Sequence, residues 1–208
     1  MSVSLILDTS SDIFSISLFE NGNVLSTFTQ KCCINCSNLI FDFIIKELDK
    51  ICIKIGDVDY IGVSTGPGSY TGIRVGVSFC LGVCEALKKP LININLLHAL
   101  EFYYRDNNYV VYPVINAKNN NIYTLIDGNV CKINIKDFKN ILSTRNDCLK
   151  RKIISSFDFL NSFGVICDNI ENVIIDNTSR IMFKLFDKKV KNNEFCDIYN
   201  YNIDYFDS

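Results

Sequence analysis

"VSTGPGSYTGIRVGVSFCLGV", residues 63–83, runs from an apolar strand through a glycine-rich turn into an apolar helix. The turn is not a P-loop, because no lysine followed by Ser or Thr comes after Gly72. Gly66, Gly68 and Gly72 are not spaced as in G-x-G-x-x-G, and Ser69 directly follows Gly68, which excludes G-x-S-x-G. Two interpretations remain: an anion at the helix start, or a tight turn for close packing.

The helix after this turn is apolar around its whole circumference. Residues 75–84 carry no charge, and Gly72, Gly76 and Cys80 form a ridge of small residues at four-residue spacing. Such a helix must be covered on every side, and a predicted helix at 37–50 also has two apolar sides. The two helices either cover each other or form an interface with another protein, and the pattern favours the interface. The residues expected there are Leu39, Ile40, Phe43, Ile44, Gly72, Ile73, Gly76, Val77 and Cys80.

The order of predicted elements repeats along the chain. The first half reads as strands 3–7, 13–19 and 24–28, helix 37–50, strand 60–65, helix 72–88, strand 91–95 and helix 96–104. The second half begins again with strands 109–115, 121–126 and 130–135, continues with short strands 164–168 and 172–176, and ends in helix 179–189. Turn segments FENGNV (19–24) and LIDGNV (125–130) fall at matching places in the two halves. We therefore expect an α/β protein of two small lobes, residues 1–106 and 107–208, each with a mixed sheet and helices.

Composition limits the classes of function. The 208 residues are 48% hydrophobic, which is enough to bury a core. The net charge of -2 gives no electrostatic footprint for nucleic acid, so any RNA is expected to be held by a partner. The N-terminus resembles no signal or transit peptide, and no apolar run is long enough to span a membrane. We expect a cytoplasmic protein with no membrane contact, whose ten cysteines are mostly reduced thiols.

Several residues are candidates for chemistry. Asp8, Thr9 and Ser10 close the first strand, where they either hold a metal-bound phosphate or form a local turn. Together with Gly66, Gly68 and Ser69 they make up the candidate nucleotide or phosphate site. Cys33 and Cys36 form a lone C-x-x-C, and a zinc site would need a second ligand pair. The single histidine, His98, is expected to be a packed or capping side chain. We therefore predict no catalytic constellation and no metal site.

Two segments resemble the TsaB (YeaZ) family. LILDTSSDIFSISLF (5–19) resembles the opening strands of the family, and DVDYIGVSTGPGSYTGIRVGVSFCLGV (57–83) is similar to its most characteristic segment. The resemblance implies a duplicated actin-like, sugar-kinase-type fold and a subunit without catalytic activity. It also implies pairing with the catalytic subunit TsaD through helices 37–50 and 72–88, in a machinery that makes threonylcarbamoyladenosine in tRNA together with the ATPase TsaE. No cofactor is then required by this chain, and ATP or ADP and Mg belong to the whole complex.

The chain departs from the family pattern in its second half. It has Asn116-Ala117-Lys118 where the family has a stretch like Asp-Ala-Arg, and a Pro-x-Tyr-x-Arg motif is reduced to residues 197–201. Two rival hypotheses stay open. One is an actin-like ATPase, kinase or peptidase-like enzyme, which would need a carboxylate in each lobe. The other is a stand-alone homodimeric binding module that uses the same apolar helices. The family resemblance also predicts a homodimer, but only when TsaD is absent.

Overall fold

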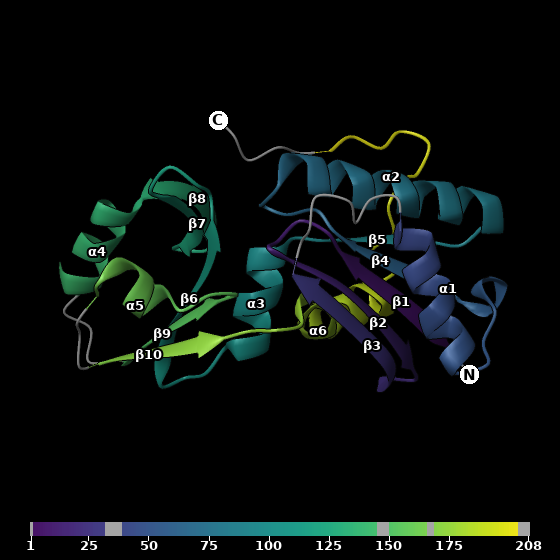
Figure 1. Cartoon of the computed structure of the whole chain (residues 1–208), viewed down its shortest axis with the longest axis horizontal. Coiled ribbons are helices and arrows are strands. Elements are labelled where there is room, and N and C mark those ends of the chain that lie inside the picture. Colours follow the sequence, from purple (N-terminus) through teal and green to yellow (C-terminus); the bar gives the residue numbers. More distant parts are fainter. Residues whose placement is uncertain (1, 32–38, 145–149, 166–168, 204–208) are drawn as a thin grey trace.

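The computed structural model describes residues 2–31, 39–144, 150–165 and 169–203. Within these ranges the strands form two five-stranded sheets, which stand beside each other in Figure 1. Both sheets are mixed, so the expected α/β class with two mixed sheets is confirmed. Cys33, Cys36 and the start of the predicted 37–50 helix lie outside the described residues.

The first sheet is built from a three-strand meander and two added parallel strands. Its order is β3-β2-β1-β4-β5. The bounds are β1 Val3–Asp8, β2 Ile13–Glu20, β3 Asn23–Lys31, β4 Tyr60–Ser64 and β5 Leu91–Ile94. Asn21 and Gly22 both have positive φ angles, of 47° and 89°, and join β2 to β3 as the predicted hairpin turn.

Helices cover both faces of this sheet. In β1, Leu5 and Leu7 pack in the core with α1 and α2, whereas Ile6 packs in the core with α3 and α6. Figure 1 shows α1 and α2 together on one side of the sheet. The helix bounds are α1 Ile40–Lys50, α2 Tyr70–Leu87, α3 Leu96–Tyr104 and α6 Thr178–Lys191, with a short 3-10 turn, η2, at Ile55–Asp57.

The second sheet repeats the first. Its order is β10-β9-β6-β7-β8, with β6, β7 and β8 antiparallel and β9 and β10 parallel to β6. The bounds are β6 Tyr109–Asn116, β7 Asn121–Ile126, β8 Asn129–Asn134, β9 Lys150–Ser155 and β10 Ile170–Ile174. The prediction that the second half repeats the strand order of the first half is confirmed.

The end of the chain returns to the first sheet. Helix α6 packs on β1, β2 and β5 and lies against α3. Beyond it, the amide of Cys196 donates to the carbonyl oxygen of Leu91 at 2.9 Å, and Ile198 and Tyr201 pack into the core beside α2. A boundary after residue 106 therefore separates the strands of the two sheets but not the helices, and the division into two domains stays a prediction.

Three elements of the second half were not predicted. They are α4 Ile135–Thr144, β9, and α5 Phe159–Phe163. The predicted strand 164–168 is wrong at its start, because Gly164 ends α5 in the left-handed conformation; residues 166–168 lie outside the described residues. The strand predicted at 172–176 begins two residues earlier, as β10.

Candidate functional site: the Asp8 cluster and the outer face of α1 and α2

The glycine-rich turn brings two loops into direct contact. The backbone amide of Ser69 donates to the carbonyl oxygen of Ser10 at 2.7 Å. A Cβ at Gly68, whose φ is 156°, would lie 2.0 Å from that same oxygen, so only glycine fits. Ser69 then begins α2 as its N-cap, with its hydroxyl accepting from the amide of Gly72. The structure therefore places the six candidate phosphate-site residues next to one another.

Asp8 is buried in the middle of this contact and is surrounded by hydroxyl groups. Its Oδ1 accepts from the amide of Ser10 at 2.8 Å and from the Ser10 hydroxyl at 2.6 Å. Its Oδ2 accepts from the hydroxyls of Ser11 at 2.8 Å and Thr178 at 2.5 Å. The contact with the Ser10 amide is an Asx turn, one of the two roles that the sequence left open. Binding of a phosphate or nucleotide here stays a prediction.

The hydroxyl groups continue along β2 to the start of α6. The Ser15 hydroxyl lies 2.8 Å from that of Thr178 and accepts from the amide of Ser179, and the Ser17 hydroxyl lies 2.7 Å from that of Ser179. All four side chains are buried. The network therefore fixes the N-terminus of α6 on the first sheet. The sequence did not predict this network, because serines at alternate positions of a strand are equally typical of a face in water.

The ridge of small residues on α2 faces the core of this chain. A Cβ at Gly72 would lie 2.0 Å from the carbonyl oxygen of Thr9, and one at Gly76 would lie 2.2 Å from the Thr9 hydroxyl oxygen. The Thr9 hydroxyl in turn donates to the carbonyl oxygen of Gly72 at 2.6 Å. Cys80, the third member of the ridge, is fully buried. The ridge thus lets α2 approach the end of β1 closely.

The nine predicted interface residues divide between core and surface. Those buried in this chain are Ile40, Ile44, Ile73, Gly76, Val77 and Cys80. Phe43 and Gly72 are partly buried, and Leu39 is 44% exposed. The buried six pack α1 and α2 onto the sheet, so any partner would meet the opposite sides of the two helices. A role of the helices in an interface stays a prediction.

The outer face of α1 and α2 carries apolar side chains that the core does not cover. Phe41 is 51% exposed, and its ring centroid lies 6.5 Å from that of Phe79 on α2. Val75 and Val83 of α2, like Phe79, are partly buried and pack against the edge of the core. In the described part of the chain, α2 is also the one helix long and apolar enough to cross a membrane by those two criteria alone. Its Ile73, Gly76, Val77, Cys80 and Cys84 are nevertheless buried against the sheet.

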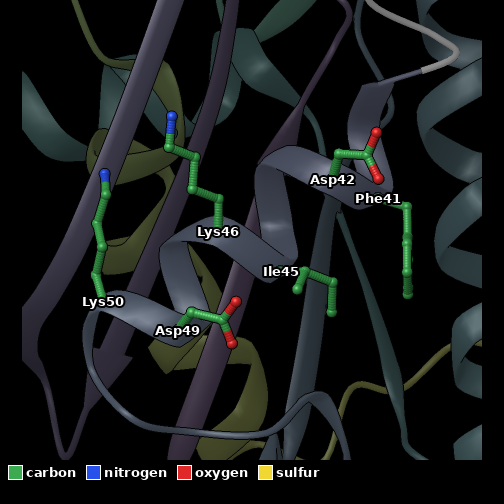
Figure 2. A pocket seen from close by; sticks show the side chains of 6 residues that line it. All are labelled: Phe41, Asp42, Ile45, Lys46, Asp49 and Lys50. Carbon is green, nitrogen blue, oxygen red and sulfur yellow. The ribbon is translucent and has the colours of Figure 1, made fainter.

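A shallow hollow of about 530 Å³ lies on the exposed side of α1. Its lining residues are Phe41, Asp42, Ile45, Lys46, Asp49 and Lys50. Figure 2 shows the two apolar side chains, Phe41 and Ile45, on one side of the helix and the two lysines on the other. The apolar side includes Phe41 of the outer face described above, and four charged side chains of α1 complete the lining.

The cysteines of α2 and the histidine of α3 make contacts typical of structural residues. Burial raises the pKa of the Cys84 thiol to about 12 and also raises that of Cys80, so both remain protonated at neutral pH. His98 lies on α3 with its Nε2 3.2 Å from the carbonyl oxygen of Gly128, in the turn between β7 and β8. Within the described residues, no three His, Cys, Asp or Glu side chains are grouped so as to hold a metal ion.

Comparisons of sequence identify the relatives of the chain. Residues 33–158, more than half of the chain, match the family model described as TsaD, tRNA N6-adenosine threonylcarbamoyltransferase. The tRNA threonylcarbamoyladenosine biosynthesis protein TsaB of Buchnera aphidicola is 30% identical over 96 residues, which is 46% of this chain and 45% of that protein. The chain spans about half the length of the first curated relatives that it matches.

Solved structures match over the whole chain and show the fold. A Pseudomonas aeruginosa protein described as similar to peptidase YEAZ has a TM-score of 0.78, 18% identity and 99% coverage of both chains. The ethanolamine utilization protein EutJ from Carboxydothermus hydrogenoformans has a TM-score of 0.52 at 10% identity, over 89% of this chain and 90% of that one. The actin-like, sugar-kinase-type fold expected from the sequence is confirmed.

Proposed function

The chain belongs to the TsaB (YeaZ) family, and on that premise we propose that it is a non-catalytic subunit that binds the catalytic subunit TsaD. The pair forms N6-threonylcarbamoyladenosine in tRNA, in the cytoplasm, together with a TsaE homologue. ATP or ADP and Mg act in the complex and are not bound by this chain for catalysis of its own.

The observation that carries the proposal is the apolar outer face of α1 and α2. Phe41 stands half exposed beside Phe79, and no charged residue interrupts α2 between Val75 and Cys84. Exposed aromatic side chains ringed by charged groups are the usual anchors of a protein interface. Burial of this face would remove apolar surface from water, which is favourable in free energy by about 25 cal/mol per Å². A protein partner of matching apolar surface is the occupant that this face fits.

The residues that end β1 and β6, at equivalent places in the two sheets, support a non-catalytic role. At the end of β1, four hydrogen bonds from within the chain already occupy the carboxylate of Asp8. At the end of β6, in the second sheet, the equivalent residue is Asn116, whose Oδ1 accepts from the amide of Lys118 at 2.8 Å. A pair of carboxylates that could hold a metal-bound nucleotide between the two sheets is therefore lacking at these positions.

A second copy of the chain is the alternative occupant of the same face. An isologous dimer would pair α1 and α2 of one copy with those of the other, and it would compete with TsaD for the surface. We expect the homodimer only where TsaD is missing, so the addition of TsaD should dissociate it.

Two experiments test the proposal. The chain, expressed with the TsaD and TsaE homologues of the same genome, should co-purify with TsaD and should restore the tRNA modification to a strain that lacks its own TsaB. The purified chain alone should not turn over ATP. ATP turnover that Asp8→Ala abolishes would support the enzyme hypothesis instead. A homodimer that persists in the presence of excess TsaD, without restoration of the modification, would support the binding module.

A further inference from the structure

On the face of the first sheet that α1 and α2 do not cover, three positively charged side chains lie around one aromatic ring. Phe102 of α3 has Lys184 Nζ 5.4 Å and Lys188 Nζ 5.2 Å from its ring centroid, and Arg105 Cζ lies 5.9 Å away. The two lysines come from α6 and the arginine follows the end of α3. All three cations are exposed to solvent.

Arg105 is paired with Glu101 at 2.8 Å, whereas the two lysines of this group have no carboxylate partner in the described part of the chain. Neither Lys184 nor Lys188 has a carboxylate oxygen within 4.0 Å among the residues that the structure describes. Neighbouring lysines of α6 differ, because Lys191 pairs with Asp187 at 2.6 Å and Lys189 lies 4.0 Å from Glu194. Arg180 extends the row of exposed cations by one helical turn. Unpaired like charges at this spacing repel one another, and an anion that bridges them removes the repulsion.

An exposed aromatic side chain borders the cations. Tyr103 is 42% exposed, its ring packs edge-on against that of Tyr104, and Lys184 Nζ lies 5.9 Å from its centroid. Cations that follow a phosphate backbone, beside an aromatic face on which a base can stack, are the combination that binds single-stranded nucleic acid.

We propose that the patch formed by Phe102, Tyr103, Arg105, Lys184 and Lys188 binds the phosphate backbone of RNA, with an unpaired base on Tyr103. This inference rests on the proposed function, which supplies tRNA as the RNA that the complex meets. The sheet lies between the patch and the outer face of α1 and α2, because α3 and α6 cover one face of it and α1 and α2 the other. RNA can thus reach the patch while a protein covers α1 and α2.

The test compares tRNA binding by charge-reversal variants of the full chain, alone and in complex with TsaD. An unmodified tRNA transcript is titrated, with fluorescence anisotropy as the readout, at 50, 100 and 200 mM salt. The double variant Lys184→Glu/Lys188→Glu should bind at least about tenfold more weakly at 100 mM, and its dependence on log salt should be shallower by about 1.5. Lys54→Glu/Lys136→Glu reverses two exposed lysines elsewhere and is the matched control.

Tyr103→Leu tests the stacking contact without changing the charge. It should weaken tRNA binding by roughly fivefold or more and leave the salt dependence unchanged. Wild-type affinity in both patch variants, or an equal loss in the control pair, would overturn the inference. Binding of the patch to phosphatidylserine vesicles but not to tRNA would overturn it as well.

Partner binding is measured on the same samples by size-exclusion chromatography. All variants should bind TsaD as the wild type does, because the patch lies across the sheet from α1 and α2. A wild-type chain that never binds TsaD contradicts the proposed function, whereas the titrations of the chain alone still decide whether the patch binds RNA.

Discussion

Helix α2 packs directly against Thr9, the residue that follows β1. Its carbonyl oxygen occupies the position that a Cβ of Gly72 would need, and its hydroxyl occupies that of a Cβ of Gly76. Because Thr9 also hydrogen-bonds to the carbonyl of Gly72, the helix and the end of β1 are joined at several points. The two glycines therefore serve close packing inside the chain.

The variant Gly72→Ala should destabilise the protein. Its Cβ would meet a backbone oxygen at 2.0 Å, which cannot move without displacing β1 or α2, so we expect a loss of about 1–3 kcal/mol in the free energy of unfolding. Gly82→Ala, in the same helix, has no atom within 4 Å of the new Cβ and should stabilise the protein by up to about 1 kcal/mol. Urea denaturation of both variants measures the difference. Equal stabilities of the two variants would contradict this role of Gly72.

At the scale of the residue, the sequence identified the small residues of α2 but did not show whether they face the sheet or a partner. The Gly72/Gly76/Cys80 ridge could be read from its spacing, but a ridge of small residues is equally suited to packing on a sheet or on a partner. The oxygen atoms of Thr9 lie more than sixty residues away in the chain, and only the fold brings them to the ridge. The cluster around Asp8 depends in the same way on Thr178.

Among the elements, β2 shows where a periodic pattern misleads. Its alternation of apolar and polar residues is typical of a strand with one face in water. Here both faces are buried, and Ser15 and Ser17 meet hydroxyl groups of α6 instead. The pattern thus predicted the strand correctly but gave no sign of the helix on its polar side.

The hydroxyl contact of Thr178 should hold α6 on the sheet. The variant Thr178→Val keeps the shape of the side chain but leaves Asp8 and Ser15 with one partner fewer, so we expect a loss of about 1–3 kcal/mol in the free energy of unfolding. The control Thr27→Val changes an exposed threonine of β3 and should alter stability by at most about 0.5 kcal/mol. Thermal or urea denaturation measures both. A loss no larger than that of the control would show that the network does not fix α6.

The second half of the chain was harder to predict for a physical reason. Helix α4 begins directly where β8 ends, so the predicted strand 130–135 included Ile135, the first residue of the helix, and no helix was predicted after it. Helix α5 is only five residues long, too short for a helical period to stand out. In the first half, by contrast, Asn21-Gly22 and the glycine-rich turn mark the element ends clearly.

At the scale of the whole molecule, the basic patch and the apolar outer face of α1 and α2 lie on opposite sides of the first sheet. The net charge of -2 predicted no contact with nucleic acid, but a sum over the chain does not reveal that Lys184 and Lys188 meet at one ring. Their convergence depends on the packing of α6 against α3, which connects segments some eighty residues apart. The apolar helices could be recognised from sequence alone, whereas the basic patch required the fold.

The central claim is that the outer face of α1 and α2 binds TsaD. The most direct measurement is the dissociation constant of the TsaD homologue for Phe41→Glu, with Ile174→Glu as the matched control. Both residues are apolar and exposed, Phe41 by 51% on α1 and Ile174 by 56% on β10, so neither change should lower the melting temperature appreciably. We predict that Phe41→Glu weakens TsaD binding by at least about 30-fold, the loss typical of an interface anchor, and that Ile174→Glu leaves it within about threefold. Wild-type affinity in Phe41→Glu, or an equal loss in Ile174→Glu, would contradict the claim.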